Sequence, residues 1–230
     1  YSTIGGGLSN NVSSSYTTVS GGNANTASSI HATVSGGINN TASGNTSTIG
    51  GGNANTASQQ YTTIGGGNTN QVTAISATVS GGSTNTAGGV ASTISGGFSN
   101  SNSGDYSTIL GGRGLTFGTN ADRSVGFHAD NTSGTLSMTI DVANVAVFGN
   151  TNFWLANNNN TPSELRFFEE YNTSGAFPNT ANYTAFKAGV QAADITYTLP
   201  TAAPTSNGQV LAATTSGVMS WVSGNAGDVV

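Results

Sequence analysis

The stretch Tyr1-Ser-Thr-Ile-Gly-Gly-Gly, residues 1–7, returns as Tyr16-Thr-Thr-Val-Ser-Gly-Gly, residues 16–22. The step from Tyr1 to Tyr16, fifteen residues, then repeats until the motif has occurred eight times, without insertion or deletion. The later copies begin at His31, Thr46, Tyr61, Ser76, Ala91 and Tyr106. So strict a period is typical of solenoids, in which each repeat forms one coil stacked on the previous coil.

Each copy has one apolar position that always holds Ile or Val and always follows a Thr. β-branched residues favour strands, whereas the Gly, Asn, Ser and Thr around them disfavour a helix. At about 3.3 Å per strand residue, one coil has room for two short strands and two tight turns. The predicted core residues are Ile4, Val19, Val34, Ile49, Ile64, Val79, Ile94 and Ile109.

Gly pairs and an Asn mark the predicted corners of the coil, between strands expected over residues 1–5 and 11–14. Both residue types accept the left-handed backbone conformation that tight turns require. The sequence therefore predicts an all-β solenoid of about eight coils. The predicted turn residues are Gly6, Gly21, Gly36, Gly51, Gly66, Gly81, Gly96 and Gly111, together with Asn10, Asn25, Asn40, Asn55, Asn70, Asn85 and Asn100.

Charge is scarce: 6% of the 230 residues are charged, and none precedes Asp105. The net charge of −5 argues against binding to nucleic acid or to an anionic membrane surface. The absence of Cys excludes disulfides and thiolate metal sites. No apolar run approaches the length of a membrane span. The chain begins inside the repeat without Met, which indicates a piece of a longer protein.

Each coil offers little apolar surface, namely one Ile or Val and one small residue such as Val12 or Ala27. This burial is small against the conformational entropy of ordering a whole coil. We therefore expect several copies of the chain to pack around a shared axis, and threefold symmetry suits narrow coils. The predicted partner is the chain itself, as a homotrimer that extends end to end into a filament.

The pattern Ser-Thr-Ile-Gly-Gly-Gly-x-x-Asn-x-Ala-Ser, as in residues 47–58, resembles the head repeats of YadA-like trimeric autotransporter adhesins. The resemblance covers residues 1–112. It implies a left-handed parallel β-roll, three chains side by side, and a location outside the cell at its surface.

Residues 113–162 are expected to form a capping or transition segment. The motif breaks at Arg113, and Asp122 and Arg123 bring the first cluster of charge. A cap of this kind ends a solenoid. Within this segment, alternating apolar residues between Leu136 and Val147 predict strands.

Residues 163–230 predict a β-meander, with short strands bounded by Asn, Gly or Pro. The block resembles modules of phage tail fibres and of large bacterial surface fibres. The resemblance is carried by Leu165-Arg-Phe, Tyr183-Thr-Ala-Phe-Lys, Ile195-Thr-Tyr-Thr-Leu-Pro, Gly208-Gln-Val-Leu and Ser220-Trp.

His128 lies near Asp122 and Asp130 in the sequence, which suggests a metal site or a catalytic pair. With no second His nearby and no Cys, a polar patch at the capping junction is the favoured interpretation. No metal site is predicted.

Glu164, Glu169 and Glu170 suggest the paired carboxylates of a glycoside hydrolase. Along one strand, Glu164 and Glu170 share a face but lie about 20 Å apart, and Glu169 is on the opposite face. Ion pairing of this segment with Arg166 is favoured instead. The sequence therefore predicts no enzymatic activity and no cofactor.

These observations predict a structural segment of an extracellular, cell-surface homotrimeric fibre or adhesin that provides stiffness and reach. A bacteriophage tail-fibre segment, located in the virion, is the alternative. A second alternative is an ice-binding β-solenoid, because Thr recurs in every coil from Thr3 to Thr108.

A surface or glycan ligand is the expected target of an adhesin, and the first residue of the motif suggests where it binds. The candidate adhesive stripe consists of Tyr1, Tyr16, Tyr61 and Tyr106, and His31 is a surface variant in the same column. Packing of the tyrosines between chains is the favoured alternative.

Overall fold

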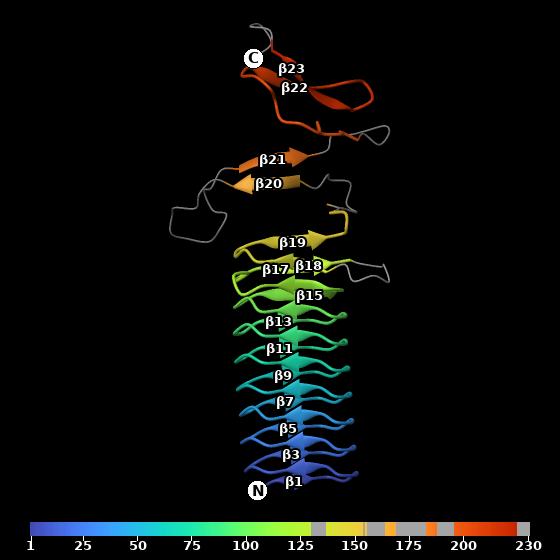
Figure 1. Cartoon of the computed structure of the whole chain (residues 1–230), viewed down its shortest axis with the longest axis vertical. Coiled ribbons are helices and arrows are strands. Elements are labelled where there is room, and N and C mark those ends of the chain that lie inside the picture. The colour runs from blue at the N-terminus through green and yellow to red at the C-terminus, as the bar shows by residue number, and fades with distance from the viewer. Residues whose placement is uncertain (130–136, 154, 156–163, 169–182, 188–195, 225–230) are drawn as a thin grey trace. The chain divides into compact units, whose positions relative to one another are not determined.

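The chain contains two units, Tyr1–Phe153 and Trp154–Val230, which are described separately below. The computed structural model describes residues 1–129, 137–153, 155, 164–168, 183–187 and 196–224. The first unit is a parallel β-solenoid of about eight turns with fifteen-residue coils, and the second contains small antiparallel sheets (Figure 1). The all-β solenoid predicted from the repeat is thereby confirmed.

Two parallel sheets run the length of the solenoid, and each coil contributes one short strand to each sheet. Sheet 1 consists of β1 (Thr3–Ile4), β3 (Thr18–Val19), β5 (Thr33–Val34), β7 (Thr48–Ile49), β9 (Thr63–Ile64), β11 (Thr78–Val79), β13 (Thr93–Ile94), β15 (Thr108–Gly112), β17 (Val125–His128) and β19 (Ala146–Gly149). Sheet 2 consists of β2 (Asn11–Val12), β4 (Thr26–Ala27), β6 (Thr41–Ala42), β8 (Thr56–Ala57), β10 (Gln71–Val72), β12 (Thr86–Ala87), β14 (Ser101–Asn102), β16 (Leu115–Phe117) and β18 (Met138–Ile140).

Equivalent residues of successive coils pair with each other, so the register repeats the sequence period. Thr3 pairs with Thr18, and the Thr3 amide donates to the carbonyl of Thr17 at 2.9 Å. A third line of contact, one residue wide, was not predicted. It is a column of isolated parallel bridges through Leu8, Asn23, Ile38, Asn53, Asn68, Ser83, Phe98 and Arg113.

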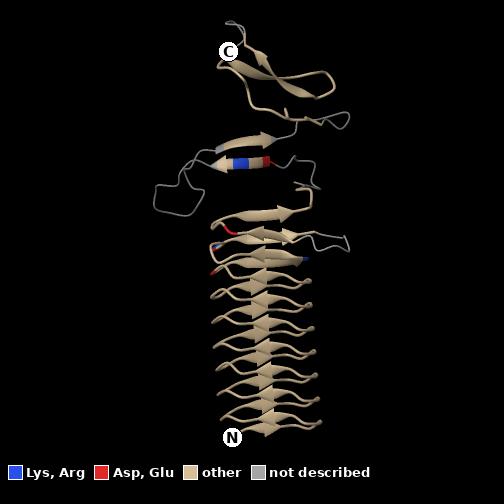
Figure 2. Ribbon diagram, viewed as in Figure 1, with Lys and Arg blue, Asp and Glu red and all other residues tan. Residues whose placement is uncertain are grey.

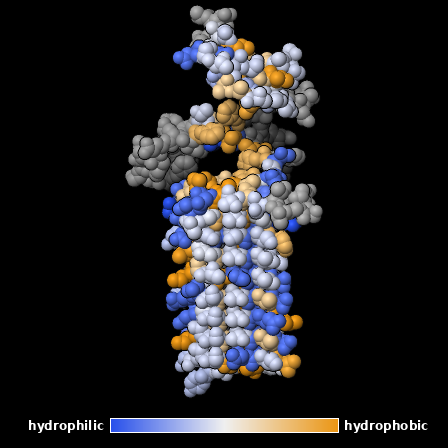
Figure 3. Space-filling view, viewed as in Figure 1, coloured by the Kyte–Doolittle hydropathy of each residue, from blue (hydrophilic) through white to orange (hydrophobic). Residues whose placement is uncertain are grey.

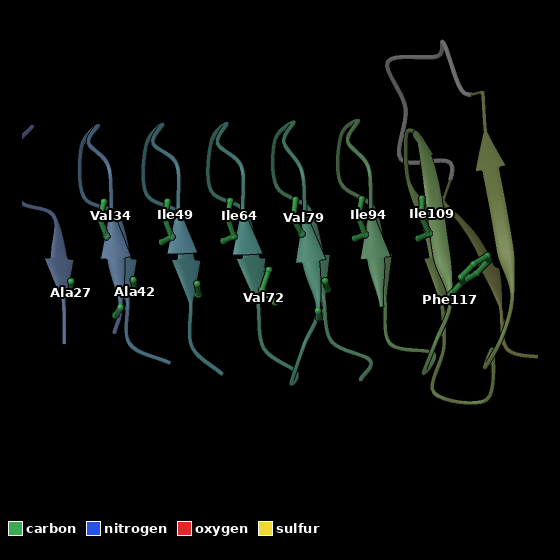
Figure 4. Packing of buried hydrophobic residues seen from close by; sticks show 14 of the residues in the cluster. Ala27, Val34, Ala42, Ile49, Ile64, Val72, Val79, Ile94, Ile109 and Phe117 are labelled. Carbon is green, nitrogen blue, oxygen red and sulfur yellow. The ribbon is translucent and has the colours of Figure 1, made fainter. Parts of the chain in front are cut away.

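The core lies inside the coils and is lined from both sheets. Val19 of sheet 1 and Ala27 of sheet 2 are both 0% exposed. The Ile and Val side chains of sheet 1 form one row along the stack, opposite the small residues of sheet 2 (Figure 4). Ile4, in the first coil, is exposed, whereas the equivalent residues of the later coils, from Val19 to Ile109, are buried.

The left-handed residues at the corners differ from those expected. Within each Gly pair, the second glycine has a φ near +90°, as at Gly22 (94°). The first glycine, for example Gly21, is outside the left-handed region in most coils, although Gly6 and Gly51 have a φ of 155° and Gly111 has a φ of 146°. The Asn residues are not left-handed. Instead, the residue directly before each of these asparagines has a left-handed backbone, as at Ala24, where φ is 55°.

Each Asn instead turns its side chain into the coil and forms a ladder along the stack. Asn70 is 0% exposed, and its Nδ2 donates to the carbonyls of Gly66 at 3.0 Å and Gly82 at 2.9 Å. Its Oδ1 accepts the amide of Asn85 at 3.0 Å. The same arrangement recurs from Asn25 to Asn100. Each of these asparagines thus satisfies buried backbone groups of its own coil and of the next coil.

The stack continues past Arg113, where the sequence predicted a cap. Val125 of β17 pairs with Thr108, and Ala146 of β19 pairs with Val125. The step between paired strands is fifteen residues in the regular coils, and it grows here to seventeen and then to twenty-one. Leu115 occupies the position of the ladder Asn, and Leu115 and Phe117 are both 0% exposed. Larger apolar side chains fill these wider coils in place of the ladder.

In the C-terminal unit, β20 (Glu164–Phe168) pairs antiparallel with β21 (Tyr183–Lys187). Separately, β22 (Gln209–Ala213) pairs antiparallel with β23 (Met219–Ser223). A single bridge joins Thr198 to Val218. These two sheets correspond to strands expected from the alternating pattern, whereas Ile195 lies outside the described residues.

Candidate functional site

The outer surface of the regular coils carries no formal charge from Lys, Arg, Asp or Glu before Asp105. In Figure 2, charged residues appear only from the end of the regular coils onward, the first being Asp105. Functional contacts of the regular coils must therefore come from hydroxyl, amide, aromatic and apolar side chains.

The outward Thr column of sheet 1 runs from Thr3 to Thr108, with side chains exposed or half-buried. Two residues later on the same face, the first seven coils hold either Gly or Ser, as at Gly50 and Ser80, and the eighth holds Leu110. Glycine leaves gaps in this column, so the face carries one continuous row of hydroxyls.

The outer face of sheet 2 carries a second array, which the sequence reasoning missed. Side chains two residues apart lie on one face of a strand, about 6.6 Å apart, and coils stack about 4.8 Å apart. Two columns of hydroxyls result in the middle of the stack. The pairs are Thr26 with Ser28, Thr41 with Ser43, and Thr56 with Ser58. The recurrent Thr-Ala-Ser triplet was the signal that would have revealed them.

The candidate adhesive stripe lies at a left-handed corner of the coil and is interrupted. Tyr1 stacks on Tyr16 with ring centroids 6.1 Å apart, and Tyr16 stacks on His31 at 5.1 Å. Tyr61 and Tyr106 are exposed, but the corners between them hold residues without rings, such as Ser76 and Ala91. The structure therefore places one three-ring stack and two separate tyrosines in this column.

Within the stack, the ring faces contact one another along the axis. Sugars bind aromatic residues through the ring face, so a glycan has access mainly to the ring edges and hydroxyls here. A stacked column of this kind is better suited to contact with another protein surface.

Exposed apolar side chains lie along the edges of the visible face of the coils (Figure 3). Leu8, Ile38 and Phe98 belong to the bridge column, and the Arg113 guanidinium lies 5.3 Å from the centre of the Phe98 ring. Isolated apolar residues of this kind are ordinary on protein surfaces. They form no continuous groove among the described coils.

His128 is a buried structural residue of the wider coils. It is 2% exposed, its Nδ1 lies 2.6 Å from the carbonyl oxygen of Arg113, and its Nε2 lies 3.1 Å from Asn150 Nδ2. Asp122 is engaged elsewhere, because its Oδ1 accepts the amide of Asp105 at 2.8 Å. Asp130 lies outside the described residues.

The described residues contain no group of three His, Cys, Asp or Glu side chains that would hold a metal ion. Asp141 has a structural role: its carboxylate accepts the amide and the side-chain Nδ2 of Asn120, each at 2.9 Å. These bonds, that from the backbone amide first, lower the pKa of Asp141 below its ordinary value.

Of the three glutamates considered as catalytic carboxylates, the structure describes Glu164. Arg166 Nε donates to Glu164 Oε2 at 2.7 Å on the exposed surface of β20. Glu169 and Glu170 lie outside the described residues.

The C-terminal unit has one further feature, a pocket of about 420 Å³. A loop before β22 forms one wall and β23 the other. Its lining includes Leu199, Pro200, Ala202, Ala203, Met219 and Trp221. None of the residues that line it is charged.

Among the described residues, no helix is long and apolar enough to span a membrane. No protein-family model matches the chain. A search of curated proteins likewise found no significant match. The candidate functional surfaces therefore rest on the geometry of this chain alone.

Proposed function

We propose that this chain is a protomer of an extracellular, cell-surface homotrimeric fibre, in which the solenoid unit supplies stiffness and reach. The proposal includes the left-handed coil and threefold association of the adhesin head repeats that the sequence resembles. It assigns the chain no enzymatic activity.

The Asn ladder is the observation that carries the proposal. Each regular coil is joined to the next by β-bridges in three columns and by buried side-chain hydrogen bonds at a corner. Bending the stack would stretch these hydrogen bonds on its outer side, and a buried polar group that loses its hydrogen-bond partner raises the free energy of the fold. Such a stack resists bending and stretching, as a spacer in a fibre must.

The outer surface supports association between copies. Uncharged faces of Thr, Ser and Gly do not repel one another, whereas net charge ordinarily keeps proteins apart. The corner tyrosines and the exposed Leu8, Ile38 and Phe98 add apolar area that neighbouring chains would cover. A bacteriophage tail-fibre segment would have the same stiff, trimeric architecture but would belong to a virion, and it remains the alternative.

Light scattering of the full chain tests the association. A mass of three times 22.8 kDa is expected, and electron microscopy should show the solenoid unit as a straight rod. A monomer at micromolar concentration would contradict the homotrimer.

The stripe is tested separately by replacing Tyr16 and Tyr61 with Ala in the full chain. If the stripe binds a cell surface, adhesion falls while the assembled mass stays constant. A fall in mass assigns the tyrosines to packing between chains, and unchanged adhesion excludes the stripe as the adhesive site.

Ice binding is the second candidate, and the hydroxyl array on sheet 2 favours it. Two columns of hydroxyls at regular spacing on a stiff face match an ordered array of water better than the single Thr column of sheet 1. Thr41→Lys with Thr56→Lys should then abolish thermal hysteresis. The control, Thr33→Lys with Thr48→Lys on sheet 1, should leave it unchanged. No hysteresis in the unmodified chain would exclude this function.

A further inference from the structure

Asn207 and Gly208 lie in a turn directly before β22, and they are the one place in the sequence where Gly follows Asn. The side-chain amide of an Asn is open to attack by the backbone nitrogen of the next residue, and the product is a cyclic imide, a succinimide. A Cβ on the next residue hinders this attack, whereas glycine has none. The composition of the turn therefore favours the reaction, and the surroundings of the two residues decide whether it is open to them.

Both reacting groups are unobstructed in the turn. Asn207 and Gly208 are exposed. Gly208 has a φ of 82°, and apart from the adjoining residues no atom lies within 4 Å of the place that its Cβ would take. Among the described residues, neither the Asn207 side chain nor the Gly208 nitrogen makes a hydrogen bond. No bond has to break before the nitrogen reaches the side-chain carbonyl carbon.

The buried asparagines of the solenoid are protected from the same reaction. Asn100 also precedes a small residue, Ser101, but it is 1% exposed. Its Nδ2 donates to the carbonyls of Gly96 and Gly112, each at 3.1 Å, and its Oδ1 accepts the amide of Leu115 at 3.0 Å. Ring closure at Asn100 would disrupt these buried hydrogen bonds, and losing them is costly.

We propose that Asn207 is a self-modification site, which loses its side-chain amide while the asparagines of the ladder keep theirs. The Gly208 nitrogen forms a bond to Asn207 Cγ, its proton passes to the side-chain nitrogen, and that nitrogen leaves as ammonia. Water then opens the succinimide at either carbonyl, which gives aspartate or isoaspartate at position 207. One water is consumed and one ammonia is released, with no oxidant or reductant. This inference goes beyond the proposed fibre and does not depend on it.

Both products change the segment that carries the pocket. Residues 196–224 contain no charged residue, and the new carboxylate gives them a negative charge at neutral pH. Isoaspartate also lengthens the backbone, because the chain then runs through the former side-chain carbon. Gln209 Oε1 accepts the amides of Thr205 at 2.6 Å and Ser206 at 3.1 Å. An extra backbone atom displaces this acceptor, so isoaspartate should release the loop that forms one wall of the pocket.

The reaction is tested by incubating the full chain in neutral buffer and mapping its peptides by mass spectrometry over time. Asn207 should lose its amide while Asn100 stays intact, and ion exchange should show the net charge of −5 becoming more negative by one unit. In Asn207→Gln, the longer side chain disfavours the ring, so this early acidic species should be absent. Equal persistence of the Asn207 and Asn100 amides, or an unchanged acidic species in Asn207→Gln, would overturn the proposal.

Incubation in urea tests the protection of the ladder. Unfolding breaks the hydrogen bonds of Asn100, so its amide should be lost faster in urea than in the folded chain, whereas Asn207 should react in both. An Asn100 that is equally inert in urea would show that the fold does not protect it, and the contrast between the two sites would fail.

Hydrogen exchange tests the effect on the loop. The protection of the Thr205 and Ser206 amides should fall in the isoaspartate form and persist in Asn207→Asp, which carries the charge on a backbone of normal length. Equal loss in both would assign the effect to charge and overturn the backbone explanation. Full protection in both would exclude any release of the pocket wall.

Discussion

The regular coils of residues 1–112 and the wider coils of residues 113–153 belong to the same two sheets but are filled differently. In the regular coils, Ile or Val faces a small residue, and buried Asn side chains bind the backbone. In the wider coils Leu115 takes the Asn position and Phe117 enters the core. Charged residues, including Asp141, appear at the corners there.

Coil width and the residue at the ladder position change together. An Asn amide reaches backbone carbonyls of its own coil and the next only when both coils have the same path, so the ladder holds the period constant. Apolar side chains impose no such match. Once Leu115 replaces the amide, the steps lengthen, first between Thr108 and Val125 and further between Val125 and Ala146.

The strongest test of the regular coil concerns its Gly pair. A Cβ on Gly67 (φ +96°) would lie 2.1 Å from the backbone oxygen of Gly82, so Gly67→Ala should destabilise the chain by about 4 kcal/mol or more. Gly66 has open space and no left-handed strain, so Gly66→Ala should cost less than about 1 kcal/mol. Urea unfolding measures both, and equal effects would show that the pair does not fix the corner.

The Asn ladder comes next in expected size. Asn70→Ala removes two donated bonds and one accepted bond from buried backbone groups, for an expected loss of about 3 kcal/mol. Asn68→Ala, two residues earlier on the exposed bridge column, should cost less than about 1 kcal/mol. Thermal unfolding of the two variants side by side decides whether the buried Asn side chains stabilise the stack more than the exposed Asn53–Asn68 side-chain bond does.

A smaller effect of opposite sign is expected at the buried Ser position before the Thr. Ser47 Oγ is buried without a hydrogen-bond partner among the described residues, so Ser47→Ala should stabilise the chain by about 1 kcal/mol. Ser107 occupies the same position next to the wider coils, and its hydroxyl has two acceptors within hydrogen-bond distance, Asn102 Oδ1 and the carbonyl of Gly104. Ser107→Ala should therefore destabilise. Calorimetry that gives the same sign for both would contradict this difference.

The smallest expected effect is a pH dependence confined to the wider coils. Hydrogen bonds from Asn120 lower the pKa of Asp141 below 3.8, so its contribution is complete above that pH and is lost as the pH falls through the folded value. The protection factor of the Asn120 amide against hydrogen exchange should fall in acid, while that of Asn85 stays constant. In Asp141→Asn, the pH dependence should disappear.

The repeat alone predicts the solenoid, the number of coils and the position of both strands. These features follow from local rules, since β-branched residues and Gly pairs at a fixed spacing leave few other structures. The inward row from Val19 to Ile109 also follows, because one apolar position per strand has to face the core.

The role of Asn and the continuation past Arg113 were not predictable in the same way. Asn suits both a left-handed turn and a buried ladder, and only the closed coil brings Asn70 to Gly82, twelve residues ahead. The change of period at Arg113 resembles an end of the stack in sequence. β15 and β17 pair with a register shift between Ile109 and Gly111, and this irregularity has no local signal in the sequence.

Because each regular coil is bonded only to the coils directly before and after it, the length of the solenoid is independent of its ends. Deleting residues 61–75 removes one full period, and residue 76 then follows residue 60 in the original register. Duplication or loss of whole repeats in the gene therefore changes the reach of the protein in equal increments without redesign of its terminal parts.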